Sequence, residues 1–360
     1  MLERMFWKIW LKRGVASQLL QPLAWLYGAL LNFRFGLYLM GYKAQYRAPV
    51  PVIVVGNIFI GGTGKTPMVI KLIEFLRLHG WNPGVISRGY GREADTVLEV
   101  TTTSLAAEVG DEPLLIVQHT DCPLFVSRSR ALAAQALLKQ HPSIDLLISD
   151  DGLQHYALGR DIEIVMYDQR GIGNGFLLPA GPLRETPKRR RDFTILNVGT
   201  NQSLQLVPPG VGDDVIQMRL QASSLSQLCN SEHQVDLASL RGKSILAAAG
   251  IGNPQRFFDL LTQAGLSFEA LPLPDHHVFD EQVFAQKTAE IILITEKDAV
   301  KCRQIAGLRQ DPRIWVVPVQ AHLEERFGVE LLKLLSEKKH GLASTRCLGV
   351  PFVQRAFGIG

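Results

Sequence analysis

A glycine-rich turn between an apolar run and a helical pattern carries the clearest chemistry in this chain. It lies in the stretch VIVVGNIFIGGTGKTPMVIKL, which runs from Val52 to Leu72. In such a turn the backbone N–H groups wrap phosphates, the lysine reaches the β- and γ-phosphates, and the following hydroxyl binds Mg²⁺. The sequence therefore predicts a site for ATP and Mg²⁺ formed by Gly61, Gly62, Thr63, Gly64, Lys65 and Thr66.

One position departs from the strict phosphate-loop pattern. The first glycine of G-x-x-x-x-G-K-[ST] would fall at position 59, which holds Phe59. A glycine turn can also join a strand to a helix for purely structural reasons. The GGTGKT run nevertheless keeps the part nearest the phosphates, with Lys65 and Thr66 at the required offset, so the prediction of a nucleotide site stands.

A pair of carboxylates follows a second apolar run. In IDLLISDDGLQH the run from Leu146 to Ser149 is followed by Asp150 and Asp151. A phosphate-loop enzyme needs a carboxylate for its metal ion. Because side chains alternate along a strand, one of the two faces the phosphates unless the turn redirects the other. An ordinary Asp-Asp-Gly turn is the alternative interpretation.

Two further motifs contain titratable residues. Asp111 in EVGDEPLLIV precedes Glu112 and an apolar run, which is typical of a helix N-cap. His276 and His277 in LPLPDHHVFD follow two prolines, which favours a surface turn, and no cluster with zinc spacing surrounds them. A catalytic role for a histidine here would be to orient a carboxylate or tune its pKa.

An alternation of strands and helices must position these motifs. Strand-like runs PLFVS, DLLIS, IEIVMYD and FTILNV follow the first unit, with helical stretches such as RALAAQALLKQ between them. This alternation predicts an α/β fold with a mostly parallel sheet of the P-loop NTPase type and a second, smaller α/β domain. The expected divisions are a membrane-associated helical segment at 1–45, the P-loop kinase domain at 46–210, a linker at 211–240, the smaller domain at 241–338 and an unassigned tail at 339–360.

Composition narrows the class of protein. The chain has 360 residues, of which 46% are hydrophobic and 20% charged, which is enough apolar side chain for buried cores. A net charge of +4, with no zinc-finger or helix-turn-helix pattern, argues against a nucleic-acid partner. The four cysteines are widely spaced, which fits a reducing cytosol and does not suggest a disulfide framework.

The basic excess is concentrated at the N-terminus. Residues 1–50 contain seven Lys or Arg against one acid, Glu3, whereas the remainder has 31 basic and 33 acidic residues. The stretch 14–33 has no charged residue, and its leucines recur at helical spacing beside Trp25 and Tyr27. These features are typical of a helix that lies on a membrane surface. A membrane-spanning helix, a signal peptide and a pair of core-packing helices are the alternatives.

Taken in order, the motifs resemble those of the tetraacyldisaccharide 4′-kinase family, the lipid A 4′-kinases. The resemblance extends from the N-terminal apolar segment to about residue 335 and rests on VGNIFIGGTGKTP, SRGYGR, GDEP, DDGLQH, PAGPLRE, DHHVF and TEKD. It implies phosphoryl transfer from MgATP to the 4′-hydroxyl of a tetraacylated glucosamine disaccharide 1-phosphate, giving the bis-phosphorylated lipid A precursor of lipopolysaccharide. It also implies a peripheral or monotopic enzyme at the cytoplasmic face of the bacterial inner membrane. The lipid and the membrane surface would be its partners, with no obligatory protein partner.

The resemblance also implies roles for individual residues. Asp111 matches the catalytic aspartate that accepts the hydroxyl proton, and His276 matches the partner that orients it. Asp150 and Asp151 match the metal-associated pair. Further active-site positions are matched by Lys65 and Thr66 of the phosphate loop, by Arg128, and by Arg184 with the metal-associated Glu185.

Three other functions fit parts of the sequence. A membrane-associated P-loop switch ATPase of the partitioning type shares GGxGKT, but its signature lysine would occupy the position of Ile60. A kinase or ligase for a soluble metabolite leaves the N-terminal segment unexplained, and a non-enzymatic scaffold leaves Lys65 and the carboxylates without a purpose. Lipid-dependent phosphate transfer would favour the kinase, and lipid-independent ATP hydrolysis would favour the switch.

Overall fold

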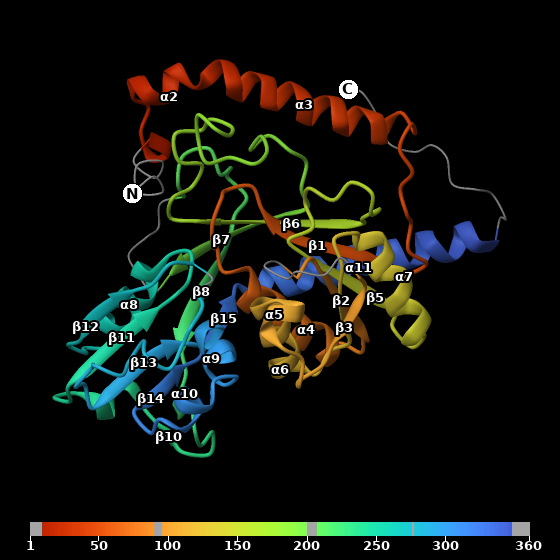
Figure 1. Cartoon of the computed structure of the whole chain (residues 1–360). Helices are drawn as coiled ribbons and strands as arrows, with labels where there is room; N and C mark the ends of the chain where they lie inside the picture. The colour runs from red at the N-terminus through yellow and green to blue at the C-terminus, as the bar shows by residue number, and fades with distance from the viewer. Residues whose placement is uncertain (1–8, 90–95, 200–206, 276, 348–360) are drawn as a thin grey trace.

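The chain builds two β-sheets that are covered by helices. The computed structural model describes residues 9–89, 96–199, 207–275 and 277–347 (Figure 1). The larger sheet has nine strands in the order β15 (Val319–Leu323), β8 (Ile216–Ala222), β7 (Phe193–Gly199), β6 (Ile162–Asp168), β1 (Val52–Asn57), β5 (Leu146–Asp150), β2 (Pro83–Ser87), β4 (Leu124–Val126) and β3 (Leu98–Val100). Its seven inner strands are parallel, and the outer strands β15 and β3 run antiparallel to their neighbours.

The smaller sheet has six strands. Their order is β10 (Gln234–Val235), β9 (Leu225–Gln227), β14 (Ile314–Val317), β13 (Ile291–Thr295), β11 (Ile245–Ala249) and β12 (Glu269–Pro272). The last four are parallel, and β9 and β10 add an antiparallel edge. Around this sheet lie η1 (Leu237–Leu240), α8 (Pro254–Gln263), α9 (Glu296–Cys302) and α10 (Ala306–Gln310). The prediction of an α/β fold with a mostly parallel sheet is confirmed, and the second sheet is also mostly parallel.

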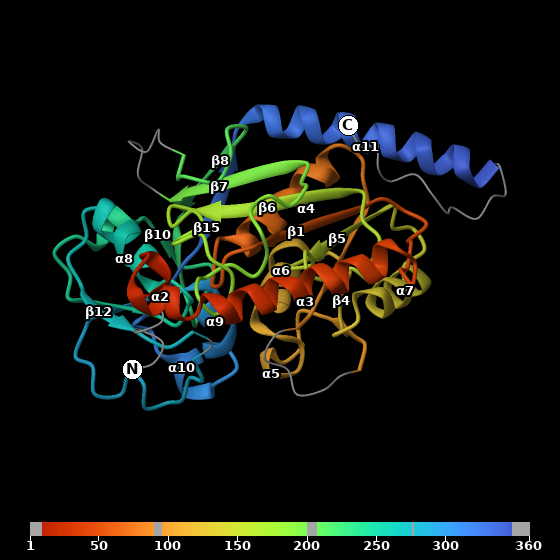
Figure 2. The same ribbon diagram turned by 90° about the horizontal axis from the view of Figure 1, so that it is seen from above.

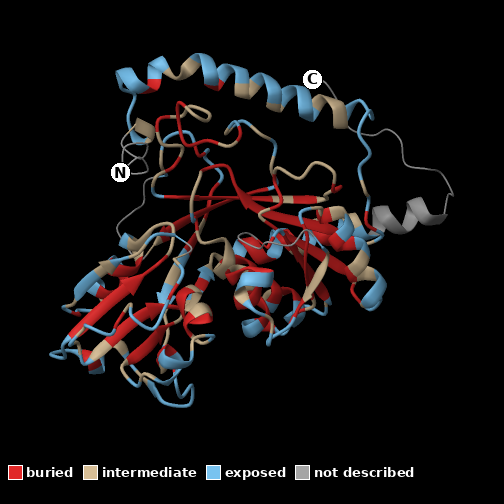
Figure 3. Cartoon of the chain, viewed as in Figure 1, coloured by how far each residue is buried: buried red, intermediate tan, exposed pale blue. Residues whose placement is uncertain are grey.

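The central strand β1 shows how the larger sheet holds its helices. Ile53 and Val55 lie in a core shared with α4 (Lys65–Leu78), α6 (Asp111–Thr120) and α11 (Glu325–Cys347), beside the short α5 (Ala106–Val109). Val52 and Val54 lie in a second core shared with α7 (Arg130–Gln140). Because side chains alternate along a strand, this β-branched run buries both of its faces, as a parallel sheet between helices requires. Figure 3 shows the central strands as buried.

The segment predicted to be a linker, 211–240, contains strands of both sheets. β8 pairs with β7 in the larger sheet, whereas β9 and β10 form the edge of the smaller one. The chain returns through β15, which pairs with β8, and α11 then packs into a core of the larger sheet. The two connections between the sheets, from β8 to β9 and from β14 to β15, lie side by side. The N–H of Ser223 in the first donates to the carbonyl of Pro318 in the second (3.1 Å). Short, half-polar strands whose partners lie far away in the sequence leave no local pattern, so the sequence analysis missed them.

Two N-terminal helices cover loops instead of a sheet. α2 (Val15–Leu19) and α3 (Gln21–Leu39) cross above the segments that follow β5 and β6 (Figures 1 and 2). The Tyr27 hydroxyl donates to the carbonyl of Arg184 (3.1 Å), and the Phe35 ring meets the Tyr156 ring edge-on. Large apolar side chains on these helices are exposed, namely Leu19, Leu23, Trp25, Leu26, Leu30 and Phe33. Within the described ranges, no helix has the length and apolar character needed to cross a membrane.

Candidate active site

The phosphate loop lies at the carboxyl end of β1, in the middle of the larger sheet. Strands β5, β6 and β7 run parallel to β1 and end at the same edge, where they place Asp150, Asp168 and Asn197. In open α/β sheets ligands bind at this edge, where loops and helix N-termini converge. The helix predicted after the loop is confirmed, since α4 begins at Lys65.

Two glycines are required by the backbone of the loop. Gly61 and Gly64 have φ angles of 95° and 91°, a left-handed region that glycine enters without steric cost. A Cβ atom on Gly64 would lie 2.5 Å from Nδ2 of Asn197, which itself donates to the carbonyl of Thr63 (3.1 Å). The amide at the end of β7 therefore holds the loop backbone in place, and only glycine fits against it.

Phe59 packs the base of the loop, at the position where the strict pattern has glycine. Its side chain is 1% exposed, and the guanidinium of Arg170 lies over its ring at 4.5 Å. Its backbone pairs with Leu183, and its carbonyl accepts a hydrogen bond from Nδ2 of Asn57 (2.7 Å). Asn57 also donates to the carbonyl of Gly61 (2.9 Å), so this one side chain stabilises the turn on both sides of Ile60.

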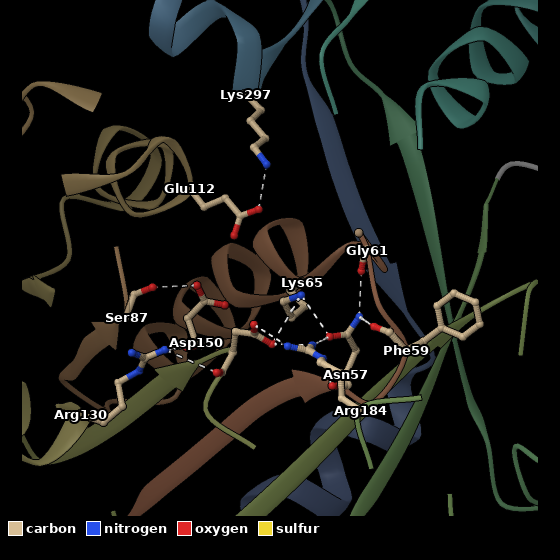
Figure 4. Close-up of polar contacts among 12 residues, drawn as sticks. Asn57, Phe59, Gly61, Lys65, Ser87, Glu112, Arg130, Asp150, Arg184 and Lys297 are labelled. Carbon is tan, nitrogen blue, oxygen red and sulfur yellow. Dashed lines mark hydrogen bonds and ion pairs between the residues drawn. The ribbon is translucent and has the colours of Figure 1, made fainter. Parts of the chain in front are cut away.

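Lys65 is held by polar groups from neighbouring segments (Figure 4). Its Nζ donates to Oδ1 of Asn57 (3.3 Å) and lies 3.6 Å from Oδ1 of Asp151. Arg184 binds the same carboxylate through both terminal nitrogens, each at 3.1 Å, and donates to the carbonyl of Asn57 (2.9 Å). These four residues form one connected network beside the phosphate loop.

Asp150 is the more deeply buried of the two carboxylates. Its side chain accepts a hydrogen bond from the Ser87 hydroxyl at Oδ2 (3.1 Å), while Oδ1 has no hydrogen-bond partner among the described residues. Arg130 donates to the backbone carbonyls of Asp150 and Asp151. Burial, followed by the negative charge of Glu112, raises the pKa of Asp150 to about 7. A buried carboxylate with an unpartnered oxygen fits a divalent cation, which favours the charged form.

Asp151 has different partners because the chain turns between the two aspartates. Its φ angle of 46° is left-handed, a conformation that Asp tolerates better than most residues. Burial alone would raise the pKa of Asp151, but the positive charges of Lys65 and Arg184 lower that pKa well below its usual range. Asp151 is therefore already paired with two cations, whereas Asp150 keeps an oxygen available.

Asp111 begins helix α6 but is not its N-cap, which corrects the local interpretation of the GDEP motif. The N-cap is Gly110, whose φ of 93° suits glycine, and the helix therefore starts one residue earlier than the pattern suggested. Oδ1 of Asp111 accepts a hydrogen bond from the N–H of Glu112 (2.9 Å). Its Oδ2 lies 3.9 Å from the Nζ atoms of both Lys297 and Lys301, which belong to α9.

The predicted partner of Asp111 is His276, the residue that follows Asp275 in the sequence. His276 falls outside the described residues, so its role stays a prediction. The preceding residue, Asp275, lies 3.5 Å from Nζ of Lys297. Lys297 therefore connects Asp275 to the start of α6.

Two other predicted site residues, Arg128 and Glu185, differ in burial. Arg128 is exposed in the segment that follows β4. Glu185 is buried and forms an ion pair with Arg189, and its Oε1 has no hydrogen-bond partner in the described part of the chain. The catalytic role of Arg128 and the metal-binding role of Glu185 stay predictions.

Several side chains that contact the site were missed by the sequence analysis. They are Asn57, Asn197, Arg130, Arg256 and Lys297. Arg256 comes from α8, donates to the carbonyl of Gly62 (3.4 Å) and forms an ion pair with Asp168 (2.5 Å). Single Asn and Arg residues carry no pattern in one sequence, whereas Lys297 belongs to the TEKD motif, a signal that could have indicated it.

Comparison with known proteins places these features in a family. The chain matches the model for tetraacyldisaccharide-1-P 4′-kinase, LpxK, over residues 16–336. The tetraacyldisaccharide 4′-kinase of Herminiimonas arsenicoxydans is 51% identical over 355 residues, covering 95% of this chain and 98% of the relative. That of Janthinobacterium sp. (strain Marseille) is 51% identical over 340 residues, covering 93% and 96%.

A solved structure has the same fold. It is the "apo" form of LpxK from Aquifex aeolicus in complex with ATP, and it matches with a TM-score of 0.73 and 29% sequence identity. The match covers 89% of this chain and 99% of that one. The motifs, the fold and these comparisons together show that the chain belongs to the tetraacyldisaccharide-1-P 4′-kinase family.

Proposed function

We propose that the chain carries out the reaction of its family, phosphorylation of tetraacyldisaccharide 1-phosphate at the 4′-hydroxyl, with MgATP as donor and at a membrane surface. The names of the family and of its relatives support the acceptor and the position. ATP bound to the Aquifex LpxK supports the donor. The product is the bis-phosphorylated precursor of lipid A.

The observation that carries this proposal is the network around Lys65. A cation at the end of a glycine-rich loop, paired with Asp151 at 3.6 Å, is aimed at the edge of the sheet where β- and γ-phosphates are bound in P-loop enzymes. The N–H groups of residues 61–66 and the start of α4 supply further donors for phosphate. Phosphoryl transfer depends mainly on such positioning and charge neutralisation.

Asp111 is the proposed base. The lipid 4′-oxygen attacks the γ-phosphorus and forms a P–O bond while the bond from that phosphorus to the β,γ-bridging oxygen breaks, releasing ADP. The hydroxyl proton passes to the carboxylate of Asp111. That carboxylate lies at the positive N-terminal end of α6, and His276 is proposed to orient it.

Asp150 and Thr66 are the proposed ligands of Mg²⁺. The fit rests on Oδ1 of Asp150, which has no hydrogen-bond partner among the described residues. Burial and the negative charge of Glu112 raise the pKa of Asp150 more than Lys65 and Arg130 lower it. In the described part of the chain no group of three or more His, Cys, Asp or Glu side chains could hold a metal. Mg²⁺ in nucleotide sites needs only one or two protein ligands beside phosphate oxygens and water. When bound, it would neutralise charge on the β- and γ-phosphates.

The N-terminal helices are the proposed contact with the membrane. A substrate with four acyl chains leaves a bilayer at a cost of about 0.8 kcal/mol per CH₂, so the enzyme has to reach it there. The exposed apolar side chains of α3 and the basic N-terminus suit an anionic membrane surface. Because ATP is the donor, we place the enzyme at the cytoplasmic face of the inner membrane.

The test is transfer of label from γ-³²P ATP to tetraacylated disaccharide 1-phosphate in mixed micelles with Mg²⁺. Wild type and Asp111→Asn are compared. Labelled lipid from wild type and a loss of about 10²-fold or more in the variant are expected. Lipid-independent ATP hydrolysis without labelled lipid would instead favour a P-loop switch ATPase, and full activity of Asp111→Asn would refute the base assignment.

A further inference from the structure

Lys297 connects the two sheets at the proposed site. It is the second residue of α9, and its side chain is 15% exposed. Its side chain points toward that of Glu112 (Figure 4). Its Nζ lies 3.1 Å from Oε1 of Glu112 and 3.9 Å from Oδ2 of Asp111. It also lies 3.5 Å from Oδ1 of Asp275. One ammonium group therefore contacts both the start of α6, with the proposed base, and the residue preceding His276.

The surrounding charges keep Lys297 positive. Burial alone would lower its pKa, but Glu112, Asp111 and Asp275 together raise the pKa of Lys297 above its ordinary value. Lys301 supplies a second cation, 3.9 Å from Asp111. Lys301 also pairs with Asp298 (3.3 Å), so four carboxylates share two ammonium groups. Loss of Lys297 would leave like charges facing one another in a largely buried place.

We propose that Lys297 is a positioning residue for phosphoryl transfer, which holds Asp111 and Glu112 against the Asp275 segment and so orients the base. The inference rests on the proposed role of Asp111 as base. An ammonium group suits this place because its N–H donors can point to several carboxylates, whereas the planar fork of arginine matches one carboxylate best.

A second contact keeps α6 and α9 together in the absence of Lys297. Nε2 of His119, near the end of α6, lies 2.6 Å from Oε1 of Glu296 at the start of α9. Lys301 also remains beside Asp111. Removal of Lys297 is therefore expected to loosen the start of α6 without unfolding the interface, and circular dichroism and thermal melting of each variant check this.

The experiment compares Lys297→Ala and Lys297→Arg with wild type, using the full chain in mixed micelles. In Lys297→Ala, kcat is expected to fall about 10²-fold, because a base displaced by about 1 Å loses a factor of that size, while the KM for ATP changes less than about threefold. Lys297→Arg keeps the charge and should recover at least about tenfold of the loss. Lys243→Ala is the matched control, because Lys243 pairs with Glu290 (3.7 Å) where both side chains are exposed.

A double-mutant cycle separates this inference from the base assignment. If Lys297 acts through Asp111, adding Lys297→Ala to Asp111→Asn should lower the residual rate by less than about threefold. Wild-type kcat in Asp111→Asn would overturn the base assignment and the inference with it. An impaired Asp111→Asn beside an unimpaired Lys297→Ala, or fully additive losses, would overturn the inference alone.

Discussion

Nη2 of Arg256 lies 2.5 Å from Oδ2 of Asp168, and this pair joins α8 beside the smaller sheet to the end of β6 in the larger sheet. Arg170 binds the same carboxylate at 2.5 Å, and Arg256 also donates to the carbonyl of Gly62. Burial would raise the pKa of Asp168, but Arg256 and Arg170 lower it more, so the pKa lies below its ordinary value. The phosphate loop is thus held directly by a residue from the other sheet.

Arg256→Ala is expected to weaken ATP binding and stability together. Asp168 keeps Arg170 but loses one of its two cations in a buried place, which should lower the free energy of unfolding by about 1–3 kcal/mol. The carbonyl of Gly62 loses its contact with Arg256 (3.4 Å) but keeps the hydrogen bond from Arg170 (3.0 Å), so the loop is loosened only in part and the KM for ATP should rise by about threefold. Urea denaturation and steady-state kinetics measure the two effects. Arg309→Ala, an exposed arginine on α10, is the control, and equal results for both variants would contradict the prediction.

Asp150 and Asp151 are expected to differ in their response to Mg²⁺. Asp150→Asn removes the proposed ligand and should raise the Mg²⁺ concentration for half-maximal activity by at least about tenfold. Asp151→Asn should instead lower kcat, because Lys65 and Arg184 lose their shared counterion, and change the Mg²⁺ requirement little. Mn²⁺ binding followed by electron paramagnetic resonance provides a readout independent of turnover. A larger loss of Mn²⁺ affinity in Asp151→Asn would reverse the assignment.

His119 is expected to make stability depend on pH. The hydrogen bond to Glu296 is the main cause that raises the pKa of His119, and the negative charges of Glu296 and Glu74 add to it. Burial and the positive charge of Arg303 lower the pKa, but by less. A raised histidine pKa stabilises the fold fully below the unfolded pKa of about 6.5, and this contribution is lost as pH rises through the folded pKa.

The unfolding free energy of wild type relative to His119→Gln should therefore fall as the pH rises above about 6.5 and through the raised pKa of folded His119. Because the side chain is 37% exposed, the change should stay below about 1 kcal/mol. Urea denaturation at each pH measures the difference, with His322→Gln, an exposed histidine on β15, as the control. A pH-independent difference would refute the prediction.

The exposed stripe on α3 is expected to bind lipid. Leu26 and Leu30 are each 58% exposed and four residues apart, so they lie on one helix face. Replacing both by Glu removes two apolar side chains and adds negative charge, which should lower binding to anionic phospholipid vesicles by at least about tenfold. Flotation with vesicles measures binding. Leu78→Glu is the control, since Leu78 is 83% exposed at the end of α4, and unchanged flotation of the α3 variant would refute a membrane role for this face.

Local patterns predicted the parts of the site that lie within single segments. The buried run of β1, the turn ending in Lys65 and the acidic pair after β5 each depend on neighbours in the chain, and the structure places them at one edge of the sheet. The same reasoning placed the cap of α6 one residue late, because Gly110 adopts a left-handed conformation that no pattern of side chains announces.

The phosphate loop, the α/β alternation and the family can be predicted from the sequence, because glycine turns, residue periodicity and ordered motifs are local properties. The fold was needed to show which aspartate has an oxygen without a hydrogen-bond partner among the described residues, and that Lys297 meets Glu112 across 185 positions of sequence. It also shows that β8 and β15 complete the larger sheet. Such contacts depend on how segments far apart in the sequence pack to bury apolar surface and pair charges. Sequence changes elsewhere in the chain can alter these contacts without changing the residue pattern of either segment.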